Sequence, residues 1–274
     1  MASLVFLNDS FSGGEEIATK LSQALGYRCL GQEVLGFVAE EYDVLEPRLL
    51  EAVEAPPSLF GMSSRTRSRC LIFLRARIAA FLREDNALYH GPAGPFLIDR
   101  ISHITRVRVT ANLDDRIARV AEQQRTTARR GRRILLRGDK KRQKWSRLVV
   151  KAEITDPSLY DLVVNLSEAP LDDALRSLSE AAVDKKFQTT TYSLKCVENF
   201  ELTARAHAAL ADLDIDAQVK ADDGVVSVRT KPSHHSKERH LELVREKVEA
   251  LQGVEEVCVE LAESLMGGIA ETMR

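Results

Sequence analysis

The chain has 274 residues, of which 44% are hydrophobic and 29% are charged, and its formal net charge is -2 at pH 7. This composition predicts one or two globular domains with buried cores, and it argues against bulk attraction to nucleic acid or to a membrane surface. No apolar run reaches the roughly 18 residues of a membrane-spanning helix and no secretory signal pattern opens the chain, so we expect a cytoplasmic protein without a transmembrane segment.

The first predicted elements are a short strand, a glycine-containing loop and a helix. Residues 3–7 favour a buried strand, and the apolar residues up to Leu25 later repeat at the spacing of one helix face. The loop of residues 10–14 lies where backbone N–H groups and a helix N-terminus can bind a phosphate. A Walker A loop continues with lysine and then serine or threonine, whereas this chain has Glu15 and Glu16. Two carboxylates therefore occupy the positions of a cation and of a metal ligand.

Helical and strand patterns alternate over the next part of the chain. Two short helices are predicted within residues 27–60, and a longer one is predicted over Arg65–Arg83. We interpret the arginine-rich side of this longer helix as a solvated face in preference to a binding surface. The remaining patterns predict strands over 87–90, 106–111 and 161–166 and helices over 113–133 and 171–183. This alternation favours an α/β architecture with a parallel sheet.

The most basic stretch runs from Arg125 to Arg147, with Asp139 as its one acidic residue. Three interpretations stay open: a lid whose guanidinium groups bind phosphate, a nucleic-acid surface, and a solvated helix pair. Trp145 is the one aromatic residue of the stretch that could stack on a base. We therefore expect no nucleic-acid partner.

Several motifs of this region resemble those of the cytidylate kinase-like family, a branch of the P-loop nucleoside monophosphate kinases. The resemblance covers about residues 3–184 and rests on SFSGGEEIATKLSQALGYR, LDDRIARV, GDKKRQKW and DPSLYDLVVNLSEAPLDDAL. It implies a three-layer α/β/α P-loop kinase-like domain with a parallel sheet, and ATP with Mg²⁺ as cofactors. It also implies a nucleotide at the glycine loop beneath a basic lid, with a site formed by Ser10, Ser12, Gly13, Gly14, Arg137, Asp139 and Arg142.

Three positions depart from the family pattern. Phe11 replaces a glycine, Glu15 replaces an arginine, and Pro92 replaces the arginine of a Gly-Arg-Gly segment. At an effective dielectric of about 20, a negative charge about 4 Å from Glu15 costs roughly 4 kcal/mol, more than the roughly 1.5–3 kcal/mol of one hydrogen bond to a charged group. The alternative is that the carboxylates stabilise the helix dipole, by about 0.3–1 kcal/mol, or turn to solvent. We expect Glu15 and Glu16 to oppose ATP and Mg²⁺, and we assign no catalytic residue.

The C-terminal part has a different pattern. Residues 185–199 are polar and threonine-rich and are predicted to be a linker between a domain of residues 1–184 and a domain of residues 200–262, with a tail over 263–274. The second domain is predicted as a small α+β unit in the order α-β-β-α-β. With DDGVVSV and LQGVEEVCVEL as signatures, it resembles a BON domain. This resemblance implies docking to a protein or lipid partner.

Two functions from different classes remain. The first is a kinase-like nucleotide-binding or regulatory protein, a pseudokinase with weak or absent phosphoryl transfer and a BON-like docking module. The second is an active cytidylate-type nucleoside monophosphate kinase that uses ATP and Mg²⁺. We expect no metal site at His234, His235 and His240, because no cysteine or carboxylate has ligand spacing to them. The residues do not identify the nucleobase or the partner, and a homo-oligomer stays open.

Overall fold

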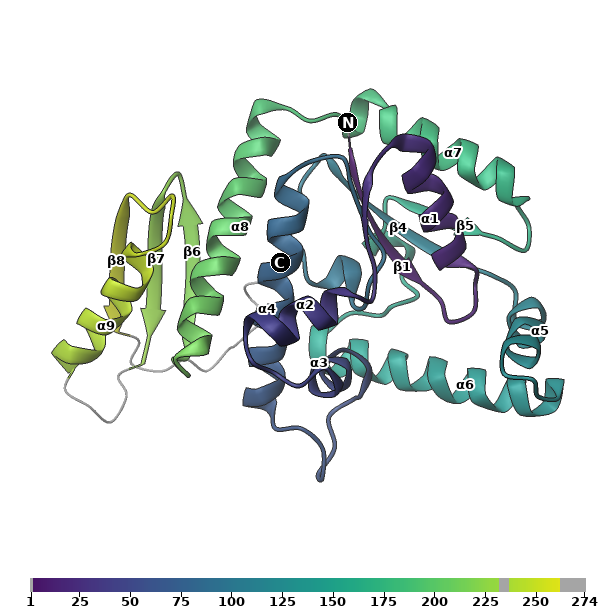
Figure 1. Cartoon of the computed structure of the whole chain (residues 1–274), viewed down its shortest axis with the longest axis horizontal. Coiled ribbons are helices and arrows are strands. Elements are labelled where there is room, and N and C mark those ends of the chain that lie inside the picture. Colours follow the sequence, from purple (N-terminus) through teal and green to yellow (C-terminus); the bar gives the residue numbers. More distant parts are fainter. Residues whose placement is uncertain (1, 232–236, 262–274) are drawn as a thin grey trace.

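The structure is a computed structural model that describes residues 2–231 and 237–261. It has an α/β unit followed by a smaller α+β unit (Figure 1). The first unit is built on a parallel sheet in the order β2-β3-β1-β4-β5, with β1 (Ser3–Asn8), β2 (Arg28–Leu30), β3 (Ala87–Tyr89), β4 (Ile104–Thr110) and β5 (Leu162–Asn165). The predicted α/β/α arrangement with a parallel sheet is confirmed. Within the described ranges, no helix is both long enough and apolar enough to cross a bilayer.

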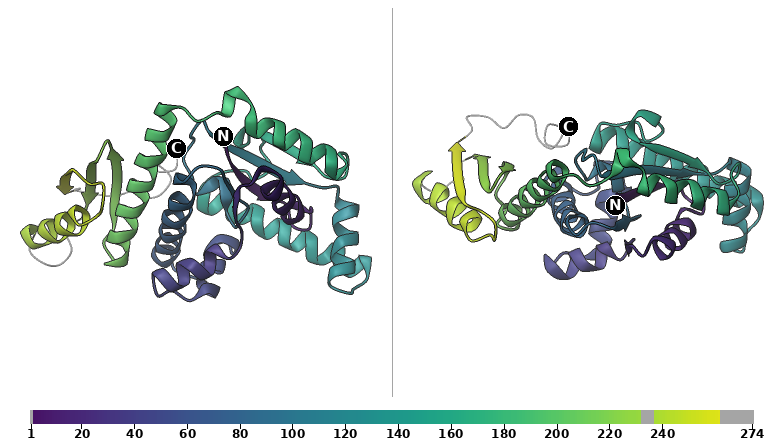
Figure 2. Two further views of the ribbon diagram at one scale, coloured as in Figure 1. Left: turned by 45° about the horizontal axis from the view of Figure 1, so that its top comes forward. Right: turned by 90° about the horizontal axis from the view of Figure 1, so that it is seen from above.

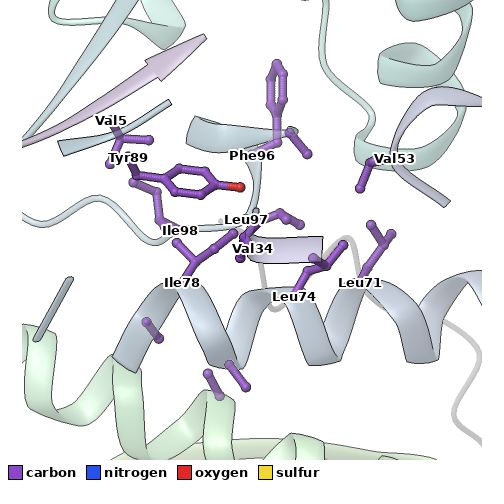
Figure 3. Packing of buried hydrophobic residues seen from close by; sticks show 14 of the residues in the cluster. Val5, Val34, Val53, Leu71, Leu74, Ile78, Tyr89, Phe96, Leu97 and Ile98 are labelled. Carbon is purple, nitrogen blue, oxygen red and sulfur yellow. The ribbon is translucent and has the colours of Figure 1, made fainter. Parts of the chain in front are cut away.

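Alternate residues of β1 face two hydrophobic cores, because successive side chains of a strand point to opposite sides of the sheet. Leu4 packs in the core under α1 and α7, and Val5 packs in the core on the other side. Figure 3 shows Ile78 of α4 pointing from the helix toward the ring of Tyr89 in this second core. The helices that cover the two faces are α1 (Gly14–Leu25) and α7 (Leu171–Val183) on one, and α2 (Val34–Glu41), α3 (Glu46–Glu54) and α4 (Ser64–Arg83) on the other.

The helix predicted over residues 113–133 is two helices, α5 (Leu113–Gln123) and α6 (Ala128–Trp145). Arg125 lies between them with a left-handed φ of 48°. The side chain of Thr127 then caps α6 by accepting a hydrogen bond from the Arg130 N–H at 3.3 Å. The short helical segments of the chain are η1 (Gly94–Phe96), η2 (Ser146–Val150), η3 (Pro157–Leu159) and η4 (Lys185–Phe187).

The predicted linker over residues 185–199 is helical in its second half. Helix α8 (Thr191–Asp212) begins there with a capping box, in which the Ser193 N–H donates to Thr190 Oγ1 at 3.1 Å and the Thr190 N–H donates to Ser193 Oγ at 2.9 Å. The segment that was predicted to be a linker is therefore helical from residue 191 onward. The division into two domains stays a prediction.

Helix α8 has two apolar stripes, and it lies between the two units in every view (Figures 1 and 2). One stripe joins the core that contains α4, and it consists of Val197, Phe200, Ala204, Ala208 and Ala211. The other joins the core of the second unit and includes Leu202, Ala206 and Leu210. A helix that is apolar on two sides has no single periodic face, so the sequence pattern does not show where it begins.

The arginine-rich side of α4 differs from the solvated face that was predicted. Arg67 and Arg75 are buried, and Arg75 pairs with Asp99 at 2.8 Å and lies 4.9 Å from the ring centre of Phe200 on α8. Other arginines of α4 form ion pairs with α8 and the residues after it: Arg65 with Asp214, Arg69 with Asp212 and Arg83 with Glu201. Most of this side of α4 is therefore an internal interface with the C-terminal part of the chain.

The second unit contains a three-stranded sheet in the order β6-β7-β8. Strands β6 and β7 are antiparallel across a turn at Asp223–Gly224, and β8 is parallel to β7. The predicted order α-β-β-α-β is found, with β6 (Ala217–Asp222), β7 (Val225–Thr230), α9 (Lys237–Glu249) and β8 (Glu256–Leu261) after α8. His240 is buried and lies 3.2 Å from Thr230 Oγ1, whereas His234, His235 and the predicted tail lie outside the described residues.

Candidate functional site

A cleft of about 1060 Å³ lies at the carboxyl ends of β1, β2 and β3, where α1, α3, α5 and α6 also contribute side chains. Its volume is of the size that small-molecule sites occupy. The predicted site residues that line it are Ser10, Ser12, Gly13, Gly14 and Arg142. Arg137 and Asp139 are not among the lining residues, and Asp139 instead accepts a hydrogen bond from Arg116 at 2.7 Å.

The loop after β1 has the sharp turns of an anion-binding loop. Gly13 has a φ of 90°, which glycine adopts without strain, and Phe11 has a φ of 61°, which costs a residue with a side chain about 1–2 kcal/mol. The side chain of Phe11 packs against the hydrophobic cluster of α5 and α6, which contains Ile117 and Leu135. This packing offsets the strain and holds the helix pair on the loop.

The loop leads into α1 without a side-chain cap, so the first N–H groups of the helix remain available as donors. The side chains beside these N–H groups are negatively charged, so they repel an anion. Glu16 forms an ion pair with Lys20 at 2.9 Å, and Glu15 is exposed and has no ion-pair partner in the described part of the chain. Asp9, which also lines the cleft, accepts hydrogen bonds from Arg108 Nη2 at 2.9 Å and from Thr110 Oγ1 at 2.7 Å.

Three arginines of α5 and α6 contact the same loop. Arg142 donates to Asn8 O at 2.8 Å and to Ser10 Oγ at 3.2 Å, and burial lowers its pKa while Asp9 opposes that shift. Arg116 donates to Ser10 O at 2.8 Å. Arg119 lies directly against Gly13, where an added Cβ would be 2.1 Å from its Nη1. Guanidinium groups that could bind a phosphate are thus already engaged with the loop.

Sequence reasoning missed Arg116 and Arg119, although both lie in the motif LDDRIARV. Their spacing could have identified them. Residues three apart are neighbours on one side of a helix, and the apolar face of this helix includes Ile117 and Val120. That helix follows β4, and loops after parallel strands meet at the edge of the sheet where ligands bind.

The far side of the cleft follows β2 and β3. Glu33 accepts a hydrogen bond from the Gly31 N–H at 2.7 Å, and the His90 ring lies against Gly31, where an added Cβ would be 2.5 Å from its Cε1. Burial lowers the pKa of His90, and the carboxylates of Glu33 and Glu15 oppose that shift. The net direction of the shift favours the neutral imidazole. Its position directly after a parallel strand is a signal that could have identified it.

The C-terminal end of α6 is fixed to the rest of the α/β unit. Trp145 is 3% exposed and donates from Nε1 to Ala52 O of α3 at 2.7 Å. Its ring makes an edge contact with Phe96 at a centroid distance of 6.2 Å. Trp145 is therefore a core residue and offers no surface for base stacking.

The hydroxyl of Ser12 in the loop leads to a prediction about stability. Its side chain is 0% exposed, and its Oγ has no hydrogen-bond partner in the described part of the chain. A buried hydroxyl without a partner costs about 1–3 kcal/mol, so Ser12→Ala is expected to leave the free energy of unfolding unchanged or to raise it by up to that amount. Urea denaturation measures the difference.

Ser3→Ala is the matched control for this measurement, because Ser3 is also 0% exposed but its Oγ accepts a hydrogen bond from the Ala87 N–H at 3.3 Å. The control is expected to lower the free energy of unfolding by about 1 kcal/mol. Equal losses in the two variants would show that the Ser12 hydroxyl has a partner and would contradict the prediction.

The loop fits its expected cofactor only in part. Its backbone offers N–H donors to an anion. Its side chains do not fit Mg²⁺ and ATP, because Glu15 and Glu16 replace the cation and the hydroxyl that bind phosphate and metal in a Walker A loop.

A family model described as the cytidylate kinase-like family matches residues 8–168 of the chain. None of the curated proteins compared with the chain matches it. A solved structure of an uncharacterized protein from Eubacterium ventriosum is similar, with a TM-score of 0.52 and 14% identity over 68% of this chain and 100% of that one. A shikimate kinase from Acinetobacter baumannii in complex with shikimate also matches, with a TM-score of 0.41 and 12% identity over 69% of this chain and 96% of that one. A shikimate kinase from Bacteroides thetaiotaomicron matches with a TM-score of 0.42 and 10% identity over 66% of this chain and 97% of that one. At these identities the first likeness shows the fold alone, and the other two carry no functional argument.

Proposed function

The chain belongs to the cytidylate kinase-like family, and on this premise we propose that it is a regulatory protein that uses a kinase-like cleft for ligand binding, with weak or absent phosphoryl transfer. In this proposal the C-terminal unit is a BON-like docking module for a protein or lipid partner. The shared helix α8 supports this role, because it packs in the cores of both units.

The observation that carries the proposal is the charge of the cleft. Its basic lining residues are Lys20, Arg119 and Arg142, whereas its acidic ones are Asp9, Glu15, Glu16, Glu33, Glu54 and Glu122. Phosphoryl transfer depends on neutralising the charge of the transferred group, and here carboxylates outnumber cations. The ion pairs of Lys20 with Glu16 and of Asp9 with Arg108 add little to this balance, which leaves Arg119 and Arg142 against Glu15, Glu33, Glu54 and Glu122.

A second candidate function is an active cytidylate-type nucleoside monophosphate kinase that uses ATP and Mg²⁺. The positions of Arg119 and Arg142 favour it, because two guanidinium groups lie against the loop. Both could stabilise the negative charge of a phosphoryl group, Arg142 after giving up its hydrogen bonds to Asn8 and Ser10. The proposed roles of Arg137 and Asp139 in a lid belong to this candidate.

Turnover decides between the two candidates. The full chain with ATP, CMP and Mg²⁺ is expected to form ADP at a rate well below the roughly 1–1000 per second of ordinary enzymes, because the cleft repels phosphate. A coupled spectrophotometric assay measures this rate. Turnover within that range would contradict the proposed function, and its loss in Arg142→Ala would then identify Arg142 as the group that compensates for Glu15.

A further inference from the structure

Helix α6 has a strongly basic face outside the cleft. Seven of its exposed cations lie within about a third of the helix circumference, since a helix has about 3.6 residues per turn. None of these seven side chains lines the cleft or forms an ion pair with a described residue, and Asp139, the one acidic residue of α6, instead pairs with Arg116 of α5 at 2.7 Å. The face is therefore available to an anionic partner. Its residues are Arg129, Arg130, Arg133, Arg137, Lys140, Lys141 and Lys144.

One row of this face contains a leucine among the cations. Its members are three or four residues apart, so they lie along one side of the helix over about 22 Å. Leu136, in the middle of the row, is 44% exposed. Such a row suits the surface of an anionic bilayer, because the cations reach the headgroups and the apolar side chain reaches the hydrocarbon below them. The row consists of Arg129, Arg133, Leu136, Lys140 and Lys144.

The loop between α3 and α4 displays two large apolar side chains. Leu59 is 98% exposed and Phe60 is 102% exposed. They occupy the corner of a turn in which the Gly61 N–H donates to Ser58 O at 3.2 Å, and glycine, proline and small polar residues are usual at such corners. We call Leu59 and Phe60 the apolar tip. Two adjacent apolar side chains in this position indicate a contact with an apolar phase or partner.

The loop holds the apolar tip from both sides. Before the tip, the buried side chain of Arg67 donates from Nη1 to Ala52 O at 2.9 Å and to Ala55 O at 2.7 Å. After the tip, the Met62 N–H donates to Glu51 Oε1 at 3.1 Å. A loop that is already fixed loses little entropy when it binds, so the tip is preorganised for contact.

The apolar tip and α6 belong to neighbouring parts of the surface. Ala52 O accepts a hydrogen bond from Arg67, which holds the loop, and another from Trp145 Nε1 at the end of α6 at 2.7 Å. In Figure 1 the α3–α4 loop and α6 both lie on the lower side of the α/β unit. Both features can therefore contact one extended surface.

We propose that this side of the α/β unit docks on an anionic phospholipid surface, with the basic face of α6 on the headgroups and the apolar tip inserted among them. The net charge of -2 does not oppose this contact, because charges farther away than about 8–10 Å are screened by salt. A nucleic-acid duplex would use the cations but leave the apolar tip in water. A single strand would need an exposed aromatic ring on α6, where Trp145 is buried. The inference is independent of the proposed function, because neither the basic face nor the tip lines the cleft.

Co-sedimentation of the full chain with vesicles made of equal parts phosphatidylcholine and phosphatidylserine tests the proposal. Each cation near an anionic leaflet raises affinity about five-fold. We therefore expect binding that weakens as salt is raised, and binding at least about ten-fold weaker to vesicles of phosphatidylcholine alone.

A variant of α6 tests the basic face. It is expected to bind the anionic vesicles at least about twenty-fold more weakly, because four cations are lost. The variant consists of Arg129→Gln, Arg133→Gln, Lys140→Gln and Lys144→Gln. The matched control removes four exposed cations elsewhere, three of them in the second unit, and is expected to change affinity by about two-fold or less. The control consists of Lys185→Gln, Lys220→Gln, Arg229→Gln and Arg245→Gln.

Leu59→Ser with Phe60→Ser tests the apolar tip separately. This double variant is expected to bind at least about ten-fold more weakly, since two large side chains no longer leave water. The matched control is Leu213→Ser with Leu243→Ser, at positions that are 40% and 44% exposed on other parts of the surface. It is expected to change affinity by about two-fold or less.

Far-UV circular dichroism checks that each variant is folded, and Arg133→Gln with Lys140→Gln replaces the larger α6 variant if that one is not. Absence of binding to the anionic vesicles would overturn the proposal, as would unchanged affinity in the α6 variant or in the tip variant. An equal loss in either control would overturn it too, because the contact would then be general or would lie in the second unit. Tighter binding to duplex DNA than to vesicles, lost in the α6 variant, would identify a nucleic-acid surface instead of a lipid one.

Discussion

Replacing Phe200 by alanine is expected to lower the free energy of unfolding by about 3–5 kcal/mol, the range of large aromatic residues in a core. Phe200 is 3% exposed and belongs to the stripe of α8 that joins the core under α4. Its ring also lies 4.9 Å from the guanidinium carbon of Arg75, which is itself buried. The substitution therefore leaves a cavity and removes a contact from a buried cation. Urea denaturation of the full chain measures the loss.

Leu194→Ala is the control on the same helix, because Leu194 is 38% exposed and lies outside both cores. It is expected to cost less than about 1 kcal/mol. Because α8 packs in the cores of both units, the Phe200 variant should unfold at a lower urea concentration in both. A loss confined to one unit, or equal losses in the two variants, would contradict the role of α8 as a shared helix.

Much of the first unit follows from local patterns in the sequence. Helix α7 has the bounds that were predicted for it, and β1 and α1 follow from an apolar run and from one periodic stripe. Strand β2 was missed because it has three residues, two of them exposed, which is too short for a pattern. The break after Gln123 was missed because no glycine or proline marks it, and the left-handed turn falls on Arg125.

The arrangement of the site residues depends on contacts between distant parts of the chain, which a local sequence pattern does not show. Arg142 reaches Asn8 across 134 positions of the chain, so its engagement with the loop is set by the packing of α5 and α6. The sequence identified the loop and its carboxylates, because both are contiguous. It did not identify Glu33, Glu54 and His90 as neighbours of that loop, because three different elements bring them there.

Exchange of Glu15 for lysine is expected to have the largest effect on the cleft. Glu15 is exposed in the first turn of α1, beside N–H groups that have no side-chain cap. Glu15→Lys removes a repulsion that reaches roughly 4 kcal/mol at about 4 Å and supplies a cation in its place. Even a third of that energy, about 1.4 kcal/mol after screening by solvent and salt, corresponds to a ten-fold gain in ATP affinity. Glu15→Gln is expected to recover only part of the gain.

Thermal denaturation of the wild type and the two variants over an ATP series measures this gain. Without ligand, Glu15→Lys is expected to melt at a lower temperature, because the interaction of Glu15 with the helix dipole, about 0.3–1 kcal/mol, is lost. ATP should then raise its melting temperature more than that of the wild type, since a ligand that binds the folded state stabilises it by mass action. Glu180→Lys, at an exposed position that does not line the cleft, is the control for general attraction of ATP to added charge. Equal shifts in all the proteins, or no shift in any, would mean that Glu15 does not control phosphate binding and that the charge of the cleft has another role.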